Sequence, residues 1–384
     1  MRKQELGTLL YFNAGVGNSN VIPGFKVENI LYNVPDCWRG NSIKEIFNLD
    51  RNANPKHRML DSGGYQISLA EKNNKRIIYD STKPILVNDS LNLTPAHVVN
   101  TAILIKPTKM TSLDYPIKEA SKVNIEMEFR KKIGYNLTWA TETSTLVQYA
   151  KSLGHLNQNT QLLIPIQCFT LEQLDYIFKY MKDIVYDGVS IPVRNLNLKG
   201  IILFLFYFYK MGIKSVHLLG TSSLPVIALS AYLAKHYFKE FSIDSTSWRE
   251  AAGANIYMGP KDLTNYVLNY NTIVGPYDII DCLCPFCSRY TFTKIKNMQQ
   301  TDKFDFLSCH NSWVINNVVK EVADLSSSID NMISILVNNT KRDNLKKELD
   351  NLYILLSLFD SLKDSEVKNF ESVVSRNKYD YIRR

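Results

Sequence analysis

Short apolar runs alternate with longer helix-like stretches between about residues 57 and 258, and this alternation limits the fold more than any other feature of the chain. The apolar runs lie at 57–60, 110–113, 161–166, 187–191, 215–219 and 240–243. The helix-like stretches lie at 118–132, 138–153, 171–182, 198–211 and 222–237. Strands that alternate with helices are typical of βαβ units around a parallel sheet. The sequence therefore predicts an α/β fold.

Polar or small residues follow or end five of these runs, where another apolar residue would be expected in a plain core strand. They are Asp61, Asp114, Gln167, Gly220 and Asp244. In a (β/α)8 barrel the carboxyl ends of the strands form the mouth of the active site. An open, doubly wound sheet also binds ligands at its strand ends, so the periodicity alone allows both folds. Either fold predicts that these five residues gather at one edge.

Composition narrows the class of protein. With 384 residues, the chain is long enough for two or three domains at roughly 150 residues each. Hydrophobic residues make up 45% and charged residues 21%, which excludes a mostly disordered chain. The longest apolar run, 201–209, is too short to span a bilayer, and the first residues lack the long apolar segment of a signal peptide. We expect a cytoplasmic protein without membrane contacts, and a net charge of +8 only weakly favours nucleic acid.

The cysteines give the strongest single motif. Cys282, Cys284 and Cys287 lie close together, and His310 follows after 22 residues. Three thiolates and one imidazole suit a tetrahedral zinc ion, and four protein ligands leave no open position for catalysis. The motif predicts about one structural Zn2+ per chain. Cys309 competes with His310 for the fourth position, and we favour His310.

Two further motifs carry carboxylates. The segment Asp61-Ser62-Gly63-Gly64-Tyr65-Gln66 follows the first predicted strand, and its glycines would let the backbone approach a ligand closely. An ordinary turn would explain the same residues. Asp114 and Asp244 end later strands, and paired carboxylates serve acid–base and nucleophilic chemistry at anomeric carbons. Each of them could instead cap a helix.

Taken together and in order, these motifs resemble the tRNA-guanine transglycosylases over about residues 57–312. The matching segments read DSGGYQ, SLDYP, PIQ, DGVSI, HLLG, FSIDS and CxCxxC…His. The resemblance implies a (β/α)8 TIM barrel with an inserted zinc-binding subdomain. It places the catalytic barrel at 1–275, the zinc-binding subdomain at 276–312 and a helical segment at 313–384, where apolar residues recur with helical spacing.

The resemblance also implies roles for individual residues. Asp244 matches the nucleophile that attacks the sugar C1′ and expels guanine, and Asp61 matches the general acid/base. The substrate-binding positions are Asp114, Gln167, Tyr65, Ser62, Gly63, Gly188, Leu219 and Gly220, and the zinc ligands are Cys282, Cys284, Cys287 and His310. Protonation makes a purine a better leaving group, and a carboxylate can hold the sugar as an ester.

Departures from the bacterial tRNA enzymes point to the substrate. Ile191-Pro192-Val193-Arg194 replaces a glycine-rich run, SLDYPI is closer to the archaeal pattern, and about 70 residues follow His310 where archaeal enzymes carry a long RNA-binding extension. The chain therefore most resembles the DNA 7-deazaguanine transglycosylases of phages and bacterial modification islands, which would act in the host cytoplasm if phage-encoded. The expected partners are DNA and a free 7-deazaguanine base such as 7-cyano-7-deazaguanine, and a homodimer is one assembly to consider. The alternatives are a tRNA enzyme of the same chemistry and a non-catalytic nucleic-acid-binding partner subunit, the latter disfavoured because all three aspartates are present.

Overall fold

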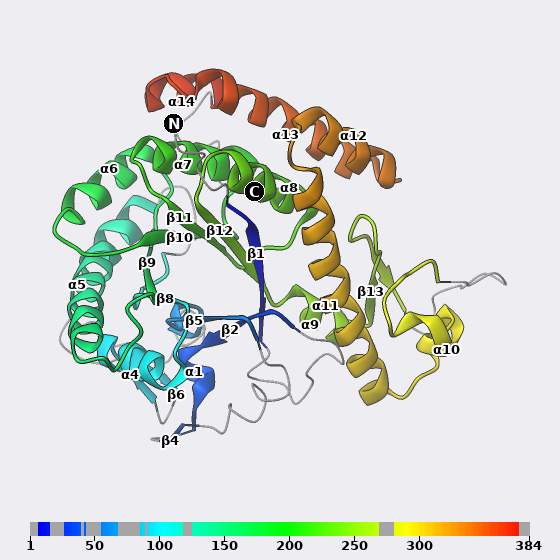
Figure 1. Cartoon of the computed structure of the whole chain (residues 1–384), viewed down its shortest axis with the longest axis horizontal. Helices are drawn as coiled ribbons and strands as arrows, with labels where there is room; N and C mark the ends of the chain where they lie inside the picture. Colours follow the sequence, from blue (N-terminus) through cyan, green and yellow to red (C-terminus); the bar gives the residue numbers. More distant parts are fainter. Residues whose placement is uncertain are drawn as a thin grey trace.

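Eight parallel strands close into a barrel in the computed structural model (Figure 1). The structure describes residues 7–15, 27–39, 42–43, 55–67, 85–88, 91–117, 125–268 and 280–375. In the order of the barrel, the strands are β1 (Leu9–Ala14), β12 (Glu240–Ser245), β11 (Ser215–Leu219), β10 (Gly188–Pro192), β9 (Gln161–Pro165), β8 (Lys109–Thr111), β5 (His57–Asp61) and β2 (Asn29–Asn33). Closure between β1 and β12 confirms the (β/α)8 barrel and excludes the open sheet.

The two strands that begin the barrel, β1 and β2, were missed by the prediction, which started the alternation at residue 57. Most residues of both strands are apolar, and nearly all are buried. They lacked a helix-like stretch after them, because the helix that follows β2 is the single turn α1 (Val34–Cys37). The remaining six barrel strands coincide with the predicted apolar runs to within three residues at either end.

Helices cover the outside of the barrel, as expected for a βαβ repeat. They are α4 (Pro95–Ile105), α5 (Ile125–Ser152), α6 (Leu171–Tyr180), α7 (Leu198–Lys210) and α8 (Leu224–His236). A single helix, α5, covers residues 125–152 of the predicted helices 118–132 and 138–153, and the predicted residues 118–124 lie outside the described residues. The prediction left residues 133–137 between the two helices, but Asn136 lies within α5, where its side chain bonds the backbone N–H and C=O of Tyr115. Thr170 caps α6 as the sequence predicted.

The chain after β12 forms the zinc-binding region and a layer of helices. Its elements are α9 (Ser247–Gly253), β13 (Ile256–Met258), β14 (Asn265–Val267), η2 (Cys287–Arg289), α10 (Phe292–Lys296), α11 (Gln300–Leu325), α12 (Ile329–Asn339), α13 (Asp343–Leu362) and α14 (Val367–Val374). The prediction found few helix signals in 276–312 and started the helical segment at residue 313, whereas α11 already begins at Gln300 and carries His310. The remaining strands form two small hairpins, β3 (Trp38–Arg39) with β4 (Ser42–Ile43) and β6 (Ile85–Asn88) with β7 (Leu91–Leu93).

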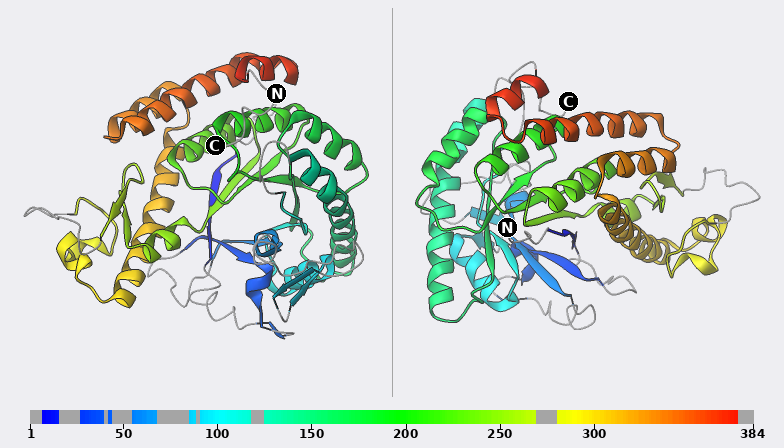
Figure 2. Two further views of the ribbon diagram at one scale, coloured as in Figure 1. Left: turned by 180° about the vertical axis from the view of Figure 1, so that it is seen from behind. Right: turned by 45° about the horizontal axis from the view of Figure 1, so that its top comes forward.

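The last helices fold back onto the barrel (Figures 1 and 2). The residues of α13 and α14 pack against α7, whose residues 200–208 are all buried. Phe206 of α7 stacks on Phe370 of α14 with ring centroids 4.1 Å apart. The hydroxyls of Tyr232 and Tyr237 on the α8 side donate to the Asp360 carboxylate of α13. This cover explains why α7 is apolar all round and why it belongs in the core.

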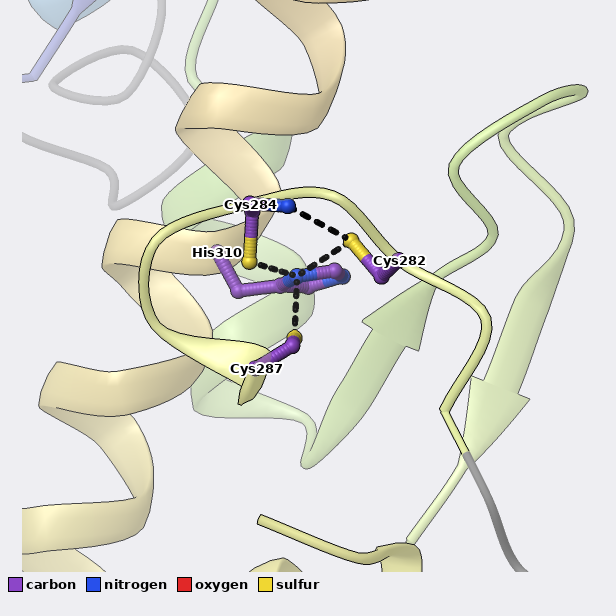
Figure 3. Close-up of side chains that lie close together, drawn as sticks. All are labelled: Cys282, Cys284, Cys287 and His310. Atoms are coloured by element: carbon purple, nitrogen blue, oxygen red, sulfur yellow. Dashed lines mark hydrogen bonds between the residues drawn. The ribbon is translucent and has the colours of Figure 1, made fainter. Parts of the chain in front are cut away.

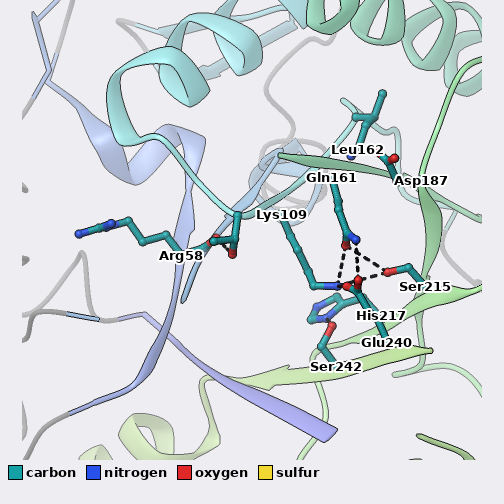
Figure 4. Close-up of polar contacts among 10 residues, drawn as sticks. Arg58, Lys109, Gln161, Leu162, Asp187, Ser215, His217, Glu240 and Ser242 are labelled. Atoms are coloured by element: carbon teal, nitrogen blue, oxygen red, sulfur yellow. Dashed lines mark hydrogen bonds and ion pairs between the residues drawn. The ribbon is translucent and has the colours of Figure 1, made fainter. Parts of the chain in front are cut away.

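A polar layer closes the amino-terminal end of the barrel interior, opposite the mouth (Figure 4). Lys109 Nζ, at the start of β8, donates to Glu240 Oε2 at 2.6 Å, Gln161 Oε1 at 2.8 Å and Ser215 Oγ at 3.2 Å. Apolar side chains, including Phe12 and Leu163, fill the interior next to this layer. Side chains therefore fill the barrel interior, and a substrate can reach the strands only at their carboxyl ends. None of the described helices is both long and apolar enough to cross a bilayer.

Candidate active site and metal centre

Three predicted site residues meet around the Asp114 carboxylate at the mouth of the barrel. Ser62 directly follows β5, Gln167 lies two residues after the end of β9, and Asp114 lies three residues after the end of β8. Ser62 Oγ donates to Asp114 Oδ1 at 2.7 Å, and Gln167 Nε2 donates to Asp114 Oδ2 at 2.6 Å. Burial raises the pKa of Asp114, and these two hydrogen bonds oppose that rise. Its two partners come from two other strand ends, so the carboxylate is held across the mouth of the barrel.

The glycines of the first motif are required by this arrangement. Gly63 has φ of +100°, which favours glycine. At Gly64, a Cβ atom would lie 2.5 Å from Asp114 Oδ1, so a side chain there would displace the carboxylate. The segment is therefore more specific than an ordinary turn: it brings backbone against the Asp114 side chain. Gly64 lies against the Asp114 carboxylate, although it was not among the predicted substrate-binding residues.

Asp61 lies at the end of β5, close enough to the other two aspartates to sense their charge. Its pKa is raised from 3.8 to about 7, first by burial and then by the charges of Asp114 and Asp244. Asn33 Nδ2 donates to Asp61 Oδ2 at 3.0 Å and Thr111 Oγ1 donates to Oδ1 at 3.3 Å. Such a carboxyl can hold or release a proton near neutral pH, which suits a general acid/base.

Asp244, in β12, is buried, and its carboxylate is held from β11. Its Oδ1 accepts a hydrogen bond from the backbone N–H of Gly220 at 2.9 Å and lies 3.1 Å from His217 Nε2. The helix that follows, α9, has Thr246 as its N-cap, so the helix-cap interpretation of Asp244 is wrong. Gly220 has φ of +77°, and the turn it allows points its N–H at the carboxylate.

Tyr65 and Arg194 face each other beside the site. The Tyr65 side chain is 52% exposed, and the Arg194 guanidinium lies 5.3 Å from the centre of its ring. Arg194 also pairs with Glu250 at 3.7 Å and lies next to Gly220. Leu219 ends β11, paired in register with Pro192 of β10. An exposed ring at a strand-end turn is free to stack on a flat ligand.

Gly188 corrects the prediction. It begins β10 and pairs with Leu163, so it lies at the opposite end of its strand from the mouth. A Cβ atom there would lie 2.3 Å from the backbone oxygen of Ser215, at the start of β11. The glycine therefore allows close strand packing at the base of the barrel and is not a substrate contact.

Sequence reasoning missed three side chains that hold the predicted carboxylates. Asn33 and Thr111 bond Asp61, and His217 contacts Asp244. Asn33 and Thr111 are the last residues of β2 and β8, and His217 lies two residues before Leu219, so all three point into the barrel. His217, two residues before Leu219, was the one visible signal, because a histidine inside an apolar run needs a polar partner.

Cys282, Cys284, Cys287 and His310 come together as the motif predicted (Figure 3). Their ligand atoms all lie within 4.8 Å of one another, and His310 Nδ1 is 3.9, 3.3 and 3.2 Å from the three sulfurs in chain order. His310 Nε2 lies 2.9 Å from the Met258 backbone oxygen, which accepts a hydrogen bond from it, so that Nδ1 can bind metal. Donor set and geometry fit a tetrahedral zinc ion. Cys309 is outside this group, while Cys37 and Cys168 are buried thiols as expected.

We compared the sequence of the chain with those of known proteins. No protein-family model matches the chain. The chain is 28% identical over 116 residues to the tRNA-guanine(15) transglycosylases of Thermococcus onnurineus and Pyrococcus furiosus, covering 29% of this chain and 18% of each relative. The enzyme of the same name from Pyrococcus abyssi is 27% identical over 109 residues, 28% of this chain and 16% of the relative. The chain thus spans less than a fifth of the length of these relatives, and over that stretch it is similar to the tRNA-guanine transglycosylases.

Proposed function

We propose that this chain is a guanine transglycosylase that exchanges guanine in DNA for a 7-deazaguanine base, such as 7-cyano-7-deazaguanine or a derivative. One observation carries the proposal: three aspartates from three strand ends stand at one barrel mouth. Asp114 and Asp244 are buried, and Asp61 is half-buried with a pKa of about 7. Base exchange needs a nucleophile, a proton carrier and a polar clamp for the base. Asp244, Asp61 and Asp114 supply one each.

In the first half-reaction, Asp244 attacks the sugar. The carboxylate oxygen forms a bond to C1′, the C1′–N9 bond breaks, and the bond's electrons leave with guanine. Asp61 gives its proton to the departing base, and its raised pKa keeps it partly protonated near pH 7. The sugar is then held as an ester of Asp244 and the polymer stays intact.

Asp114 and Gln167 recognise the base edge in this proposal. Both oxygens of Asp114 are already oriented by Ser62 and Gln167, so the carboxylate is preorganised to accept N–H groups of a guanine-like edge. Tyr65 offers an exposed ring face for stacking. A 7-deazaguanine shares these N–H groups with guanine, so one pocket serves both bases.

In the second half-reaction the incoming base replaces Asp244. Asp61, now ionised, takes the N9 proton of the base, N9 bonds to C1′, and the C1′–O bond breaks to restore the Asp244 carboxylate. The zinc ion that Cys282, Cys284, Cys287 and His310 would hold supplies a structural cross-link between α11 and the loop at 282–287.

The proposal also names the nucleic acid in which the base is exchanged. We favour DNA because of the sequence departures described above; α13 and α14 pack on α7 and form part of the cover of the barrel. tRNA is the second candidate, supported by the names of the relatives, which act on tRNA. The retained aspartates count against a non-catalytic partner subunit.

Exchange of radiolabelled guanine into duplex DNA, single-stranded DNA and bulk tRNA tests the proposal. The wild type should label DNA, and substitution of Asp244 by Asn or Ala should abolish labelling while polymer binding persists. Substrate trapped on the wild type should give a covalent adduct on denaturing gels, and Asp350→Asn, a substitution at an exposed aspartate on α13, is the matched control. Labelling of tRNA alone would replace DNA by the second candidate. An undiminished adduct in Asp244→Ala, or no labelling of any polymer, would overturn the assignment.

A further inference from the structure

His217 is a fully buried titratable side chain that the proposed chemistry leaves without a role. It lies in the middle of β11 and points into the barrel interior between the polar base layer and the mouth (Figure 4). Phe12 contacts the imidazole edge-to-face, with ring centroids 6.2 Å apart, and so restrains the plane of the ring. A buried imidazole needs partners for both nitrogens, and both are present.

The two partners of His217 determine where its proton lies. Nδ1 is 2.9 Å from Ser242 Oγ and Nε2 is 3.1 Å from Asp244 Oδ1. Without a proton on Nε2, its lone pair would face a carboxylate oxygen, which is repulsive. Nε2 therefore carries a proton and donates a hydrogen bond to Asp244. Nδ1 then accepts a hydrogen bond from the Ser242 hydroxyl, giving a chain of hydrogen bonds from Ser242 through His217 to Asp244.

The two oxygens of Asp244 are consequently unequal. Oδ1 accepts from His217 Nε2 and also from the Gly220 N–H at 2.9 Å. Among the described residues, no hydrogen bond to Oδ2 is found, so Oδ2 is the oxygen that can bond to C1′. We propose that His217, oriented by Ser242, is a positioning residue that aims Oδ2 of Asp244 at the sugar and makes the carboxylate a better leaving group in the second half-reaction. This inference rests on the proposed function.

The leaving-group effect follows from where charge develops. When the ester forms, Asp244 loses its negative charge, and the hydrogen bond from His217 to Oδ1 weakens. When the incoming N9 bonds to C1′ and the C1′–Oδ2 bond breaks, the electron pair returns to the carboxylate and the same hydrogen bond strengthens. A donor fixed on Oδ1 therefore assists release of Asp244 more than attack by it. Without that donor, the balance should move toward the covalent ester.

A matched pair of substitutions tests the role of His217. His217→Leu removes the donor, whereas the amide nitrogen of His217→Gln can reach Asp244 in place of Nε2. In His217→Leu we expect release of the adduct, chased with excess free base, to slow about 10- to 100-fold, the range for a hydrogen bond to a charged group. The steady-state fraction of protein in adduct should rise while turnover falls. His217→Gln should recover most of the release rate.

Two serines on the strands that flank β11 provide the second comparison. Ser242→Ala should slow release several-fold, because the imidazole loses the group that fixes its tautomer. Ser190→Ala removes an equally buried hydroxyl, in register with His217 on β10 but without a hydrogen-bond partner in the described part of the chain, and should change nothing. Thermal unfolding of all four variants separates misfolding from kinetic effects. Equal slowing of adduct formation and release in both His217 variants, or unchanged release in His217→Leu, would overturn the inference. A wild type that forms no adduct would instead reject the proposed function.

Discussion

Asp61→Asn should make the protein more stable above pH 4 while removing its acid/base. Folding raises the pKa of Asp61 from 3.8 to about 7, so the folded state favours the protonated form. The folded state then binds more protons than the unfolded state between these two values, and stability from this residue is lost as pH rises from 4 to 7. An asparagine is always neutral and escapes this loss.

The magnitude follows from the shift. A difference of about 3 pKa units corresponds to about 4 kcal/mol at 1.36 kcal/mol per unit. Local opening and solvent relaxation reduce such penalties, so we expect about 2 kcal/mol by pH 8 and almost none at pH 4. The fold can accept the amide: its oxygen can take the hydrogen bond from Asn33, and its nitrogen can donate to Thr111, whose hydroxyl also accepts from the Ser62 N–H.

Urea unfolding of the wild type and Asp61→Asn, repeated from pH 4 to pH 8, measures this effect. The difference in unfolding free energy between the two proteins should grow with pH and level off just above pH 7. Asp350→Asn on the exposed face of α13 should show no such trend. A difference that does not change with pH, or a variant less stable than the wild type at pH 8, would refute the placement of Asp61 as a destabilised buried acid.

Three further changes probe other parts of the molecule. Asp114→Asn should lower kcat/KM about a hundredfold or more for both bases, because an amide N–H would face a base N–H; unchanged exchange rates would remove Asp114 from the base pocket. Metal analysis should find about one zinc per chain in the wild type and none in Cys284→Ser, with a lower melting temperature, whereas full retention of zinc would exclude this ligand set. Lys109→Met should lower the unfolding free energy by about 2 kcal/mol, because it leaves Glu240 half-buried without its cation, while exchange per folded molecule stays unchanged.

The barrel was predictable where strand and helix signals reinforced each other. Six strands were found because each apolar run precedes or follows a clear helical pattern, and because their outer faces are buried under helices. β1 and β2 escaped because the link after β2 contains only one helical turn. The prediction divided α5 at residues 133–137, whereas the helix continues through Asn136, whose side chain bonds the backbone of Tyr115, a case in which packing overrides local preference.

Site residues at strand ends could be predicted from the sequence, whereas those inside strands could not. Asp61, Asp114 and Gln167 interrupt or end apolar runs, so their placement at the mouth follows from parallel topology. His217 lies mid-strand, and only the register between β11 and β12 brings it to Asp244. Gly188 was assigned to the wrong end of its strand because a sequence motif does not show which end of a strand a glycine serves.

The contacts of helix α11 limit the order in which parts of this protein can fold. His310 on α11 belongs to the zinc ligands, Asn311 bonds the backbone of Trp248 and Met258, and Ser312 donates to Asn13 of the first strand at 2.7 Å. The last of these contacts spans 299 residues of chain. Contacts between such distant segments form slowly, because a long loop must close before they give any stabilisation. During synthesis, most of the chain must therefore be made before β12, and then α11, can pack against β1. Until α11 docks, the apolar side chains of β1 stay exposed and need protection from aggregation.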